Sequence, residues 1–343
     1  MFVASALLAA SLTAQTLTLD SGAVRMNWEL NGGSLSSMRL KEGGENPFTW
    51  EDKSAPPTAR MRGHFLCLDR WGAPSDSEKA AGMPFHGEAS KVAWKQRGSS
   101  TTDADMSAQL PMARLSIRRT VKLQGESALV SETVTNDAPL GRVYNMVQHP
   151  TIAPPFLDES VLVDSNARQG FMQSSPMPNP EQPSVVWPQA LRDGAPVNMR
   201  HLTNDPEPNV VSYVVDEAWG WTTAVNPGQG VLLGYVWRTS EYPWFNAWRH
   251  VENGKPAARG LEFGTTGLHQ PYPILIRKGR IFGRPIFAFL DGAETQTREY
   301  QVFLLKVPSG HQGMASMKAA GGDFIFTGRD GKELRIRSLF AAR

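Results

Sequence analysis

The sequence predicts an all-β protein, built as one large antiparallel β-sandwich. Apolar residues recur mostly at every second position, which is typical of strands with one buried face, and helical periodicity is scarce. The 31 glycines and 25 prolines are spread along the 343 residues rather than gathered in one linker, as expected for many short strands joined by tight turns. We therefore expect a single sandwich domain over residues 15–343.

The composition narrows the possible functions. A hydrophobic content of 41% is enough for a large buried core and excludes a disordered chain. The 35 Lys and Arg residues against 33 Asp and Glu leave a net charge of only +2, and no basic run is long enough to follow a phosphate backbone, so no nucleic acid partner is expected. Cys67 is the only cysteine, which excludes an internal disulfide and a cysteine zinc site.

The first residues, MFVASALLAASLTAQ, form an apolar stretch that differs from the rest of the chain. It is too short to span a bilayer about 30 Å thick but has the length of a signal-peptide core, and small residues near its end suit cleavage. We predict a signal peptide at residues 1–14 and a periplasmic or secreted protein, with no membrane insertion after cleavage. Because the stretch carries no Lys or Arg, a packed N-terminal strand is the alternative.

The first patterned segment, residues 16–40, alternates apolar and polar residues around an SG turn and an NGG turn, which predicts hairpins. Residues 113–137 repeat the pattern, with a QG pair at the reversal. The same alternation returns in four later segments, at residues 230–239, 272–290, 299–307 and 323–340. Residues 171–210, rich in Pro, Asn and Asp, are expected to form a long excursion over the surface.

Three residues occupy sequence contexts that suit acid–base chemistry. His86, in GMPFHGEAS, precedes a glycine, where the backbone can come close to a ligand. His149 closes a strand-like run and is followed by a proline. Glu262 lies between two apolar residues, which predicts partial desolvation, a raised pKa and the ability to abstract a proton near neutral pH.

Each of these residues also has a structural interpretation. Either histidine can be a turn residue bonded to the backbone, and Glu262 can accept hydrogen bonds from turn amides. A metal site formed by the three is disfavoured because the chain has no H-x-H or H-E-x-x-H pair, so neither a metal nor a cofactor is expected. The remaining histidines are assigned structural or surface roles by default, and His269, being near Glu262, is the least secure of them: His64, His201, His250, His269 and His311.

Four segments, in this order along the chain, resemble the galactose mutarotase (aldose 1-epimerase) superfamily, whose fold is a large antiparallel β-sandwich. LNGGSLSSMRLKEGGENPF resembles the family's first hairpin, and FHGEAS the segment with its first active-site histidine. NMVQHPTIAPPF resembles the segment with its second histidine, and RGLEFGTTG the strand with its general-base glutamate. The resemblance covers nearly all of the predicted mature chain. Glu88 departs from the family pattern, which commonly has a glycine there.

The resemblance implies an aldose 1-epimerase that needs no cofactor. Glu262 would take the proton of the anomeric hydroxyl, His149 would protonate the ring oxygen, and His86 would hold the ring oxygen or a neighbouring hydroxyl. Many members also use an acidic residue to bind sugar hydroxyls, for which Asp216 and Glu241 are both candidates.

Further substrate contacts are expected from arginines and aromatic residues. Arg62 and Arg70, upstream of His86, can donate hydrogen bonds to hydroxyls or a carboxylate. The segment YVWRTSEYPWFNAWRH offers a stacking platform for a pyranose, although packing between two sheets is the alternative for each ring. The aromatic residues concerned are Tyr235, Trp237, Tyr242, Trp244 and Trp248. We select Trp237 and Trp244 as candidates, and expect Trp244, beside a proline, to be exposed.

The sequence thus predicts a monomer or weak dimer that interconverts the anomers of a monosaccharide or of a glycan end. The alternative is a non-catalytic carbohydrate-binding β-sandwich of an exported glycan-utilisation system. A sugar-phosphate epimerase is disfavoured by the small net charge and the predicted export. A hydrolase or lyase is disfavoured because hydrolysis needs two carboxylates at one bond, and only Glu262 stands out.

Overall fold

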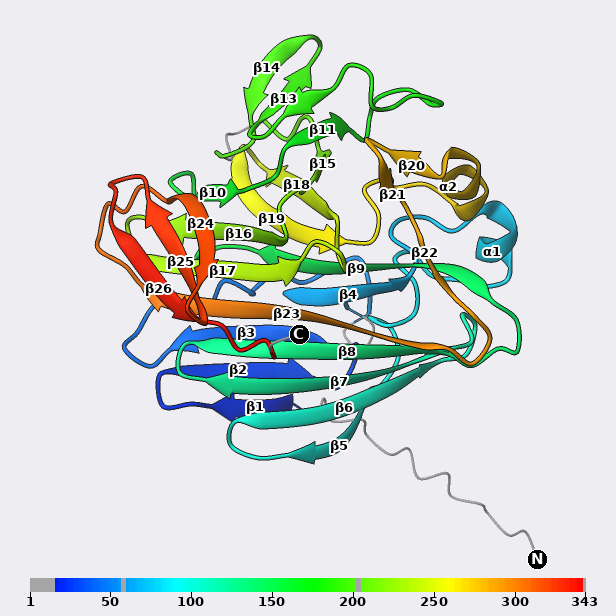
Figure 1. Cartoon of the computed structure of the whole chain (residues 1–343), viewed down its shortest axis with the longest axis horizontal. Coiled ribbons are helices and arrows are strands. Elements are labelled where there is room, and N and C mark those ends of the chain that lie inside the picture. Colours follow the sequence, from blue (N-terminus) through cyan, green and yellow to red (C-terminus); the bar gives the residue numbers. More distant parts are fainter. Residues whose placement is uncertain (1–15, 57–59, 202–204, 342–343) are drawn as a thin grey trace, which may run out of the picture.

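A computed structural model describes residues 16–56, 60–201 and 205–341, which form two large antiparallel sheets packed face to face (Figure 1). The predicted all-β sandwich is confirmed. The predicted signal peptide, residues 1–14, lies outside the described residues, so export stays a prediction, as does the oligomeric state. No helix in the described ranges is long and apolar enough to cross a membrane.

The larger sheet carries the elements that matter for the site. Every strand pair in it is antiparallel, and β22 (Ala288–Leu290) pairs with β9 beside the main path. The main path runs in the order β1 (Thr16–Asp20), β2 (Val24–Glu29), β3 (Ser34–Leu40), β4 (His64–Asp69), β9 (Arg142–Ile152), β19 (Lys255–Gly264), β18 (Trp244–Glu252), β15 (Val210–Val214), β11 (Gln169–Met172) and β12 (Val185–Val186).

The second sheet covers one face of the first. Its order is β10 (Leu162–Ser165), β16 (Trp219–Asn226), β17 (Val231–Arg238), β23 (Thr295–Lys306), β8 (Ser127–Asn136), β7 (Leu115–Gln124), β6 (Asp103–Leu110) and β5 (Lys95–Ser99). The smaller elements are α1 (Asp76–Ala80), β13 (Gln189–Arg192), β14 (Ala195–Asn198), α2 (Tyr272–Lys278), β20 (Arg280–Ile281), β21 (Arg284–Pro285), β24 (Met314–Ala320), β25 (Asp323–Gly328) and β26 (Glu333–Arg337).

Two segments differ from what the sequence pattern indicated. Residues 272–278, expected to be a strand, form the helix α2, with proline in its first turn, basic residues in its last and Gly279 ending it at φ 72°. A short apolar run fits either a strand or a helix, and these end signals decide for the helix. The expected surface excursion at 171–210 contains β12 and the β13–β14 hairpin, which projects beyond the sheets (Figure 1).

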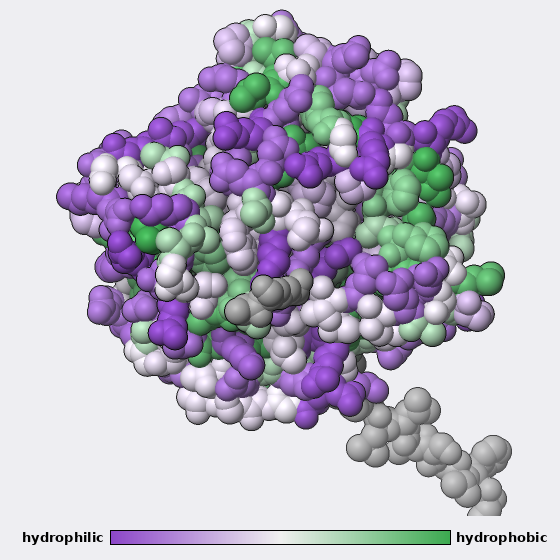
Figure 2. All heavy atoms as spheres, in the orientation of Figure 1, coloured by the Kyte–Doolittle hydropathy of each residue, from purple (hydrophilic) through white to green (hydrophobic). Residues whose placement is uncertain are grey.

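The alternation of apolar residues explains how the sheets pack. Buried and less buried residues alternate strictly along β7, so only one face of this strand meets the core. By contrast, β9 and β19 are almost continuously buried, which means that loops cover the face turned away from the second sheet. Figure 2 shows a mainly hydrophilic surface, with hydrophobic residues gathered toward the side where α2 and β22 lie. The covered face of β9 and β19 is where chemically active side chains can be desolvated.

A buried ionic network joins the two sheets behind that face. Arg119 of β7 donates to Glu132 of β8 at 2.6 Å, and both side chains are almost fully buried. The amide of Gln148 donates to Glu132 and to a tyrosine hydroxyl, and its oxygen lies 3.1 Å from Nε2 of His64. The hydroxyl of Tyr235 reaches His64 Nδ1 at 3.1 Å. Burial holds the pKa of His64 well below its usual range, so this histidine is a neutral structural link, as the default assignment expected.

We predict that Arg119→Met lowers the free energy of unfolding by about 3–5 kcal/mol, because Glu132 is left as a buried charge without its partner. Replacing both partners, Arg119→Met with Glu132→Leu, should restore much of the loss. Urea denaturation measures both effects. The neighbouring Arg118 pairs with Asp105 at 2.7 Å on the exposed face. Arg118→Met is therefore the matched control, with an expected loss below about 1 kcal/mol. Equal losses for the two single variants would contradict the interpretation.

Candidate functional site

The strand register places a row of three side chains on the covered face of the larger sheet. Gln148 of β9 pairs with Phe263 of β19, and both point into the core, where Phe263 stacks on a tryptophan of β17. Side chains alternate along a strand. The chain neighbours of this pair, His149 in β9 and Glu262 in β19, therefore point to the opposite face. Phe65 of β4 pairs with His149 on its other side. Phe65, His149 and Glu262 therefore lie side by side across three strands.

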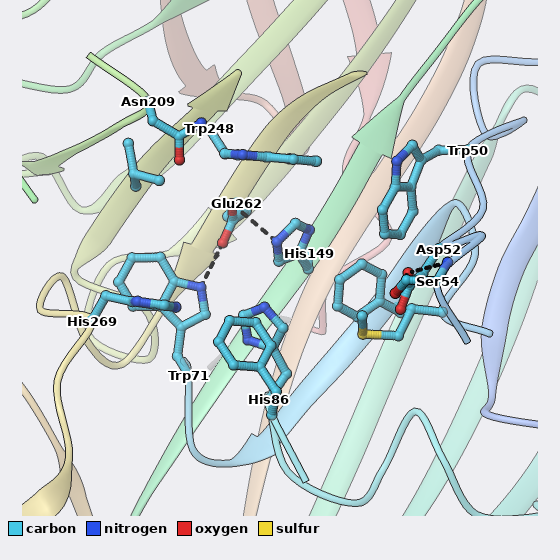
Figure 3. A pocket seen from close by; sticks show the side chains of 14 residues that line it. Trp50, Asp52, Ser54, Trp71, His86, His149, Asn209, Trp248, Glu262 and His269 are labelled. Carbon is cyan, nitrogen blue, oxygen red and sulfur yellow. Dashed lines mark hydrogen bonds and ion pairs between the residues drawn. The ribbon is translucent and has the colours of Figure 1, made fainter. Parts of the chain in front are cut away.

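These side chains line a cavity of about 400 Å³ (Figure 3). The structure brings together His86, His149 and Glu262, the three residues selected from the sequence for acid–base chemistry. The full lining is Trp50, Asp52, Ser54, Met61, Phe65, Trp71, Phe85, His86, His149, Asn209, Val210, Trp248, Glu262 and His269.

The Glu262 carboxyl is 1% exposed and has two close partners. Its Oε1 lies 3.2 Å from Nε2 of His149, and its Oε2 accepts a hydrogen bond from the indole N–H of Trp71 at 2.7 Å. Burial raises the pKa of Glu262 well above its usual range, and the bond from Trp71 opposes that rise only in part. A Cβ at Gly260 would lie 2.7 Å from Oε1, so a glycine there leaves room for the carboxyl.

The imidazole of His149 is held by a stacking contact and by a hydrogen bond at its Nδ1. Phe65 stacks on it at 4.2 Å between ring centroids, and Nδ1 lies 2.9 Å from the hydroxyl oxygen of Thr151. That hydroxyl donates to the carbonyl of His149, so its oxygen accepts from Nδ1–H. In the neutral ring Nε2 then carries no proton and faces Glu262. Burial lowers the pKa of His149 to about 3. The raised pKa of Glu262 and the lowered pKa of His149 both favour a pair that holds one proton between a carboxyl and an imidazole.

His86 presents an N–H group to the same cavity. Its Nδ1 accepts a hydrogen bond from the backbone N–H of Gly72 at 3.1 Å, so the neutral ring carries its proton on Nε2. Burial keeps the pKa of His86 well below its usual range, which makes the neutral form the relevant one. His86 has a φ of 66°, and a Cβ at the following Gly87 would lie 2.0 Å from the carbonyl of Leu68. The glycine after His86 thus permits a close backbone approach, here to β4 rather than to a ligand.

Most of the lining was not selected from the sequence, and His269 and Trp71 are two such residues. His269, assigned a structural role by default, packs edge-to-face on Trp71 at 4.7 Å between centroids and lies 5.8 Å from His86 by the same measure. Burial lowers its pKa to about 4. Its closeness to Glu262 in the sequence was the only signal. No sequence signal pointed to Trp71, because nothing in the pattern distinguishes a tryptophan that points into a cavity from one in the core.

The four charged candidates for substrate binding lie outside the cavity lining. Arg70 is 5% exposed and forms ion pairs with Asp69 and with a glutamate of α1. Arg62 pairs with a glutamate at 3.3 Å. Asp216 pairs with an arginine of β21 at 3.0 Å, and Glu241 accepts a hydrogen bond from a backbone N–H of β23 at 2.7 Å. Each of these side chains has an ion-pair partner within the protein.

The two selected tryptophans also lie elsewhere. Trp237 stacks on Phe263 between the sheets at 4.3 Å, which is the alternative that the sequence left open. The expectation that Trp244 is exposed is wrong, since it is fully buried and donates its indole N–H to the carbonyl of Pro285. The chain after β19 folds back over Trp244 and covers it. Trp248 is the member of the aromatic segment that lines the cavity.

Comparison with solved structures identifies the fold. A galactose mutarotase related enzyme from Lactobacillus acidophilus matches with a TM-score of 0.64 and 11% identity, over 86% of this chain and 99% of that chain. The chain has a galactose mutarotase-like fold. Galactose mutarotase-like proteins from Lactobacillus casei and Clostridium acetobutylicum match with TM-scores of 0.63 and 0.61, at 14% and 10% identity. They cover 85% and 86% of this chain, and 100% and 96% of theirs.

No family model matches the sequence, and no curated protein matches it. The fold therefore rests on the structural likeness and the chemistry on the site itself. Within the part of the chain that the structure describes, no group of three or more His, Cys, Asp or Glu side chains is arranged to hold a metal ion. The arrangement that is present, a carboxyl and an imidazole sharing a proton beside a second imidazole N–H, suits proton transfer.

We predict that Trp71→Phe raises the pKa of Glu262 further, because the variant loses the N–H donor that stabilises the carboxylate. Infrared difference spectra of the carboxyl band, assigned by its loss in Glu262→Gln, follow this pKa. Trp248→Phe is the control. It removes an indole of the same cavity, one that packs edge-on to His149, and should change the pKa of Glu262 less. A pKa of Glu262 that is unchanged or lower in Trp71→Phe would contradict the prediction.

Proposed function

We propose that the protein is an aldose 1-epimerase that interconverts sugar anomers by general acid–base catalysis in this cavity. The observation that carries the proposal is the buried contact between Glu262 and His149, in which a carboxyl with a raised pKa faces an imidazole with a lowered one. Such opposed shifts are typical of groups that exchange protons with a substrate. The galactose mutarotase-like fold supports the proposal.

A pair with one proton can act as base and acid in the same step. When the proton sits on His149, Glu262 is a carboxylate and can take the proton of the anomeric hydroxyl, while the imidazolium gives its proton to the ring oxygen. The bond between C1 and the ring oxygen then breaks, its electrons stay on the oxygen, and C1 becomes an aldehyde. Rotation about the C1–C2 bond and reversal of both transfers give the other anomer.

The remaining lining suits a pyranose in this step. The Nε2–H of His86 can donate to the ring oxygen or to a neighbouring hydroxyl, and so stabilise charge that develops on the oxygen. Trp71 keeps the Glu262 carboxyl oriented, and a cavity of about 400 Å³ is within the range of small-molecule sites, about 300–1,000 Å³. The alternative, a binding module of the same fold, has no need for a desolvated carboxyl in contact with an imidazole.

We predict that Glu262→Gln abolishes anomer exchange, with a loss of about 10²–10⁴-fold, because glutamine cannot accept the proton. Sugar affinity should stay within a few-fold, since the amide keeps the size of the carboxyl. Exchange spectroscopy by NMR on a set of common hexoses and their 6-deoxy forms measures the rate, and ligand-observed NMR the affinity. Glu29→Gln, at a buried glutamate of β2 outside the cavity, is the control and should keep the wild-type rate. If the wild-type protein accelerates anomer exchange for none of these sugars, the catalytic proposal is wrong.

The rate of anomer exchange should be constant over a middle pH range and should fall at both lower and higher pH. Below about pH 3 a second proton enters the pair at His149, and no base remains. As the pH rises through the raised pKa of Glu262, the pair loses its last proton and no acid remains. Exchange rates measured across the pH range, corrected for the uncatalysed reaction, test this. A rate that keeps climbing through the alkaline limb would show that only the carboxylate form of Glu262 matters.

A further inference from the structure

The cavity contains carboxyl groups but no side chain of the opposite charge. Among the described residues, its lining includes Asp52 and Glu262 and no Lys or Arg. Lys91 interacts electrostatically with Asp52 but does not belong to the lining. A phosphate or carboxylate on a ligand would lose hydration here without a cationic partner in the lining, which is unfavourable. The lining therefore favours a neutral sugar.

The carboxyl of Asp52 lies apart from the pair formed by Glu262 and His149. In Figure 3, Asp52 lies beside Trp50 on one side of His149, while Trp71 lies on the other side. Asp52 is half-buried, and it belongs to the lining although it contacts neither member of the pair. A carboxyl in this position can bind a ligand without taking part in the proton transfers.

Only one of the two carboxyl oxygens of Asp52 is used within the described part of the chain. Its Oδ1 accepts a hydrogen bond from the backbone N–H of Ser54 at 3.1 Å and another from the Ser54 hydroxyl at 2.5 Å. No group of the described residues donates a hydrogen bond to Oδ2. A half-buried carboxylate oxygen of this kind is an open acceptor, and the hydroxyl groups of a sugar are donors.

The chain contains the same turn a second time, at a distance from the cavity lining. Oδ1 of Asp158 accepts from the backbone N–H of Ser160 at 2.8 Å and from its hydroxyl at 2.6 Å. Here the second oxygen is also engaged, because the side-chain amide of Asn226 donates to Oδ2 at 2.9 Å. The turn itself uses only Oδ1 in both places. Oδ2 of Asp52 is therefore available for a role other than forming the turn.

From these observations, and resting on the proposed function, we infer that Asp52 is a specificity-determining residue whose Oδ2 accepts a hydrogen bond from a hydroxyl group of a neutral sugar. A hydrogen bond to a carboxylate is stronger than one between two neutral groups. The same carboxylate repels an anionic sugar, and the lining among the described residues has no Lys or Arg to offset that repulsion. One side chain thus favours hydroxyl groups and disfavours negative charge.

The test compares Asp52→Asn with the wild-type protein on two matched pairs of sugars, D-galactose with D-galacturonic acid and D-glucose with D-glucuronic acid. Asparagine keeps an Oδ1 for the Ser54 turn and replaces Oδ2 by an amide nitrogen. Anomer exchange by NMR gives kcat and KM. For the neutral sugar that the wild-type protein accepts, we expect KM to rise about 10-fold in the variant, because a neutral amide replaces a charged acceptor. The kcat should stay within a few-fold, since Asp52 does not contact the acid–base pair.

The wild-type protein should also prefer the neutral member of the accepted pair by at least about 10-fold in kcat/KM. In Asp52→Asn this preference should narrow, because the repelling charge is gone and Lys91 has lost a negative neighbour. Asp158→Asn makes the same substitution in the same kind of turn outside the lining, and is the matched control. It should keep the wild-type kcat and KM for both members of the pair.

An unchanged KM for the neutral sugar in Asp52→Asn would overturn the inference and leave the epimerase proposal intact. Equal wild-type kcat/KM for the neutral and anionic members would do the same. A fall in kcat without a rise in KM would also contradict it, since Asp52 would then act on the proton transfers rather than on binding. If the wild-type protein accelerates anomer exchange of neither neutral sugar, the epimerase proposal fails, and the inference fails with it.

Discussion

The contact between Glu262 and His149 is the interaction on which the rest of the site depends, and the register of two strands creates it. If β19 slipped by one residue against β9, Glu262 would turn into the core and Phe263 would turn out of it. The inner face prevents this, because Phe263 stacks on Trp237 and Gln148 is tied to Glu132. The register of β19 against β9 therefore determines both the packing of the core and the position of Glu262 beside His149 on the outer face.

A second constraint comes from the loop that follows β4. Asp69 ends this strand with a φ of 82°, fully buried, and it is paired with Arg70 and Arg142. The chain then presents Trp71 to the Glu262 carboxyl, and the backbone of the next residue exchanges hydrogen bonds with His86. One braced loop thus orients Glu262, which comes from β19, and His86, which lies in a turn between α1 and β5. Arg70, expected to bind substrate, has the role of holding that loop.

The sequence was informative where a pattern has a direct physical meaning. Alternation of apolar residues predicted the sandwich, because this pattern depends on local sequence. The burial and raised pKa of Glu262 were also predicted, but its apolar neighbours Leu261 and Phe263 lie in the core, and the side chains that desolvate the carboxyl, such as Trp71, come from elsewhere in the chain. The directions of Trp237 and Trp244 could not be predicted in this way. Which face a strand residue occupies is set by register, and what covers that face is set by distant loops. His269 joins the site for the same reason, through the chain that follows β19.

The apolar character of the cavity links its electrostatics to its choice of ligand. Aromatic rings around Glu262 keep water away from its carboxyl, and this desolvation raises the pKa of the carboxyl. Among the described residues the lining contains no Lys or Arg, so an anion in this space would have no cationic partner in the lining. A site that bound an anionic sugar would need an arginine or lysine in the lining, and that charge would stabilise the carboxylate and lower the pKa of Glu262. The raised pKa of Glu262 therefore fits the neutral sugar that we propose as substrate.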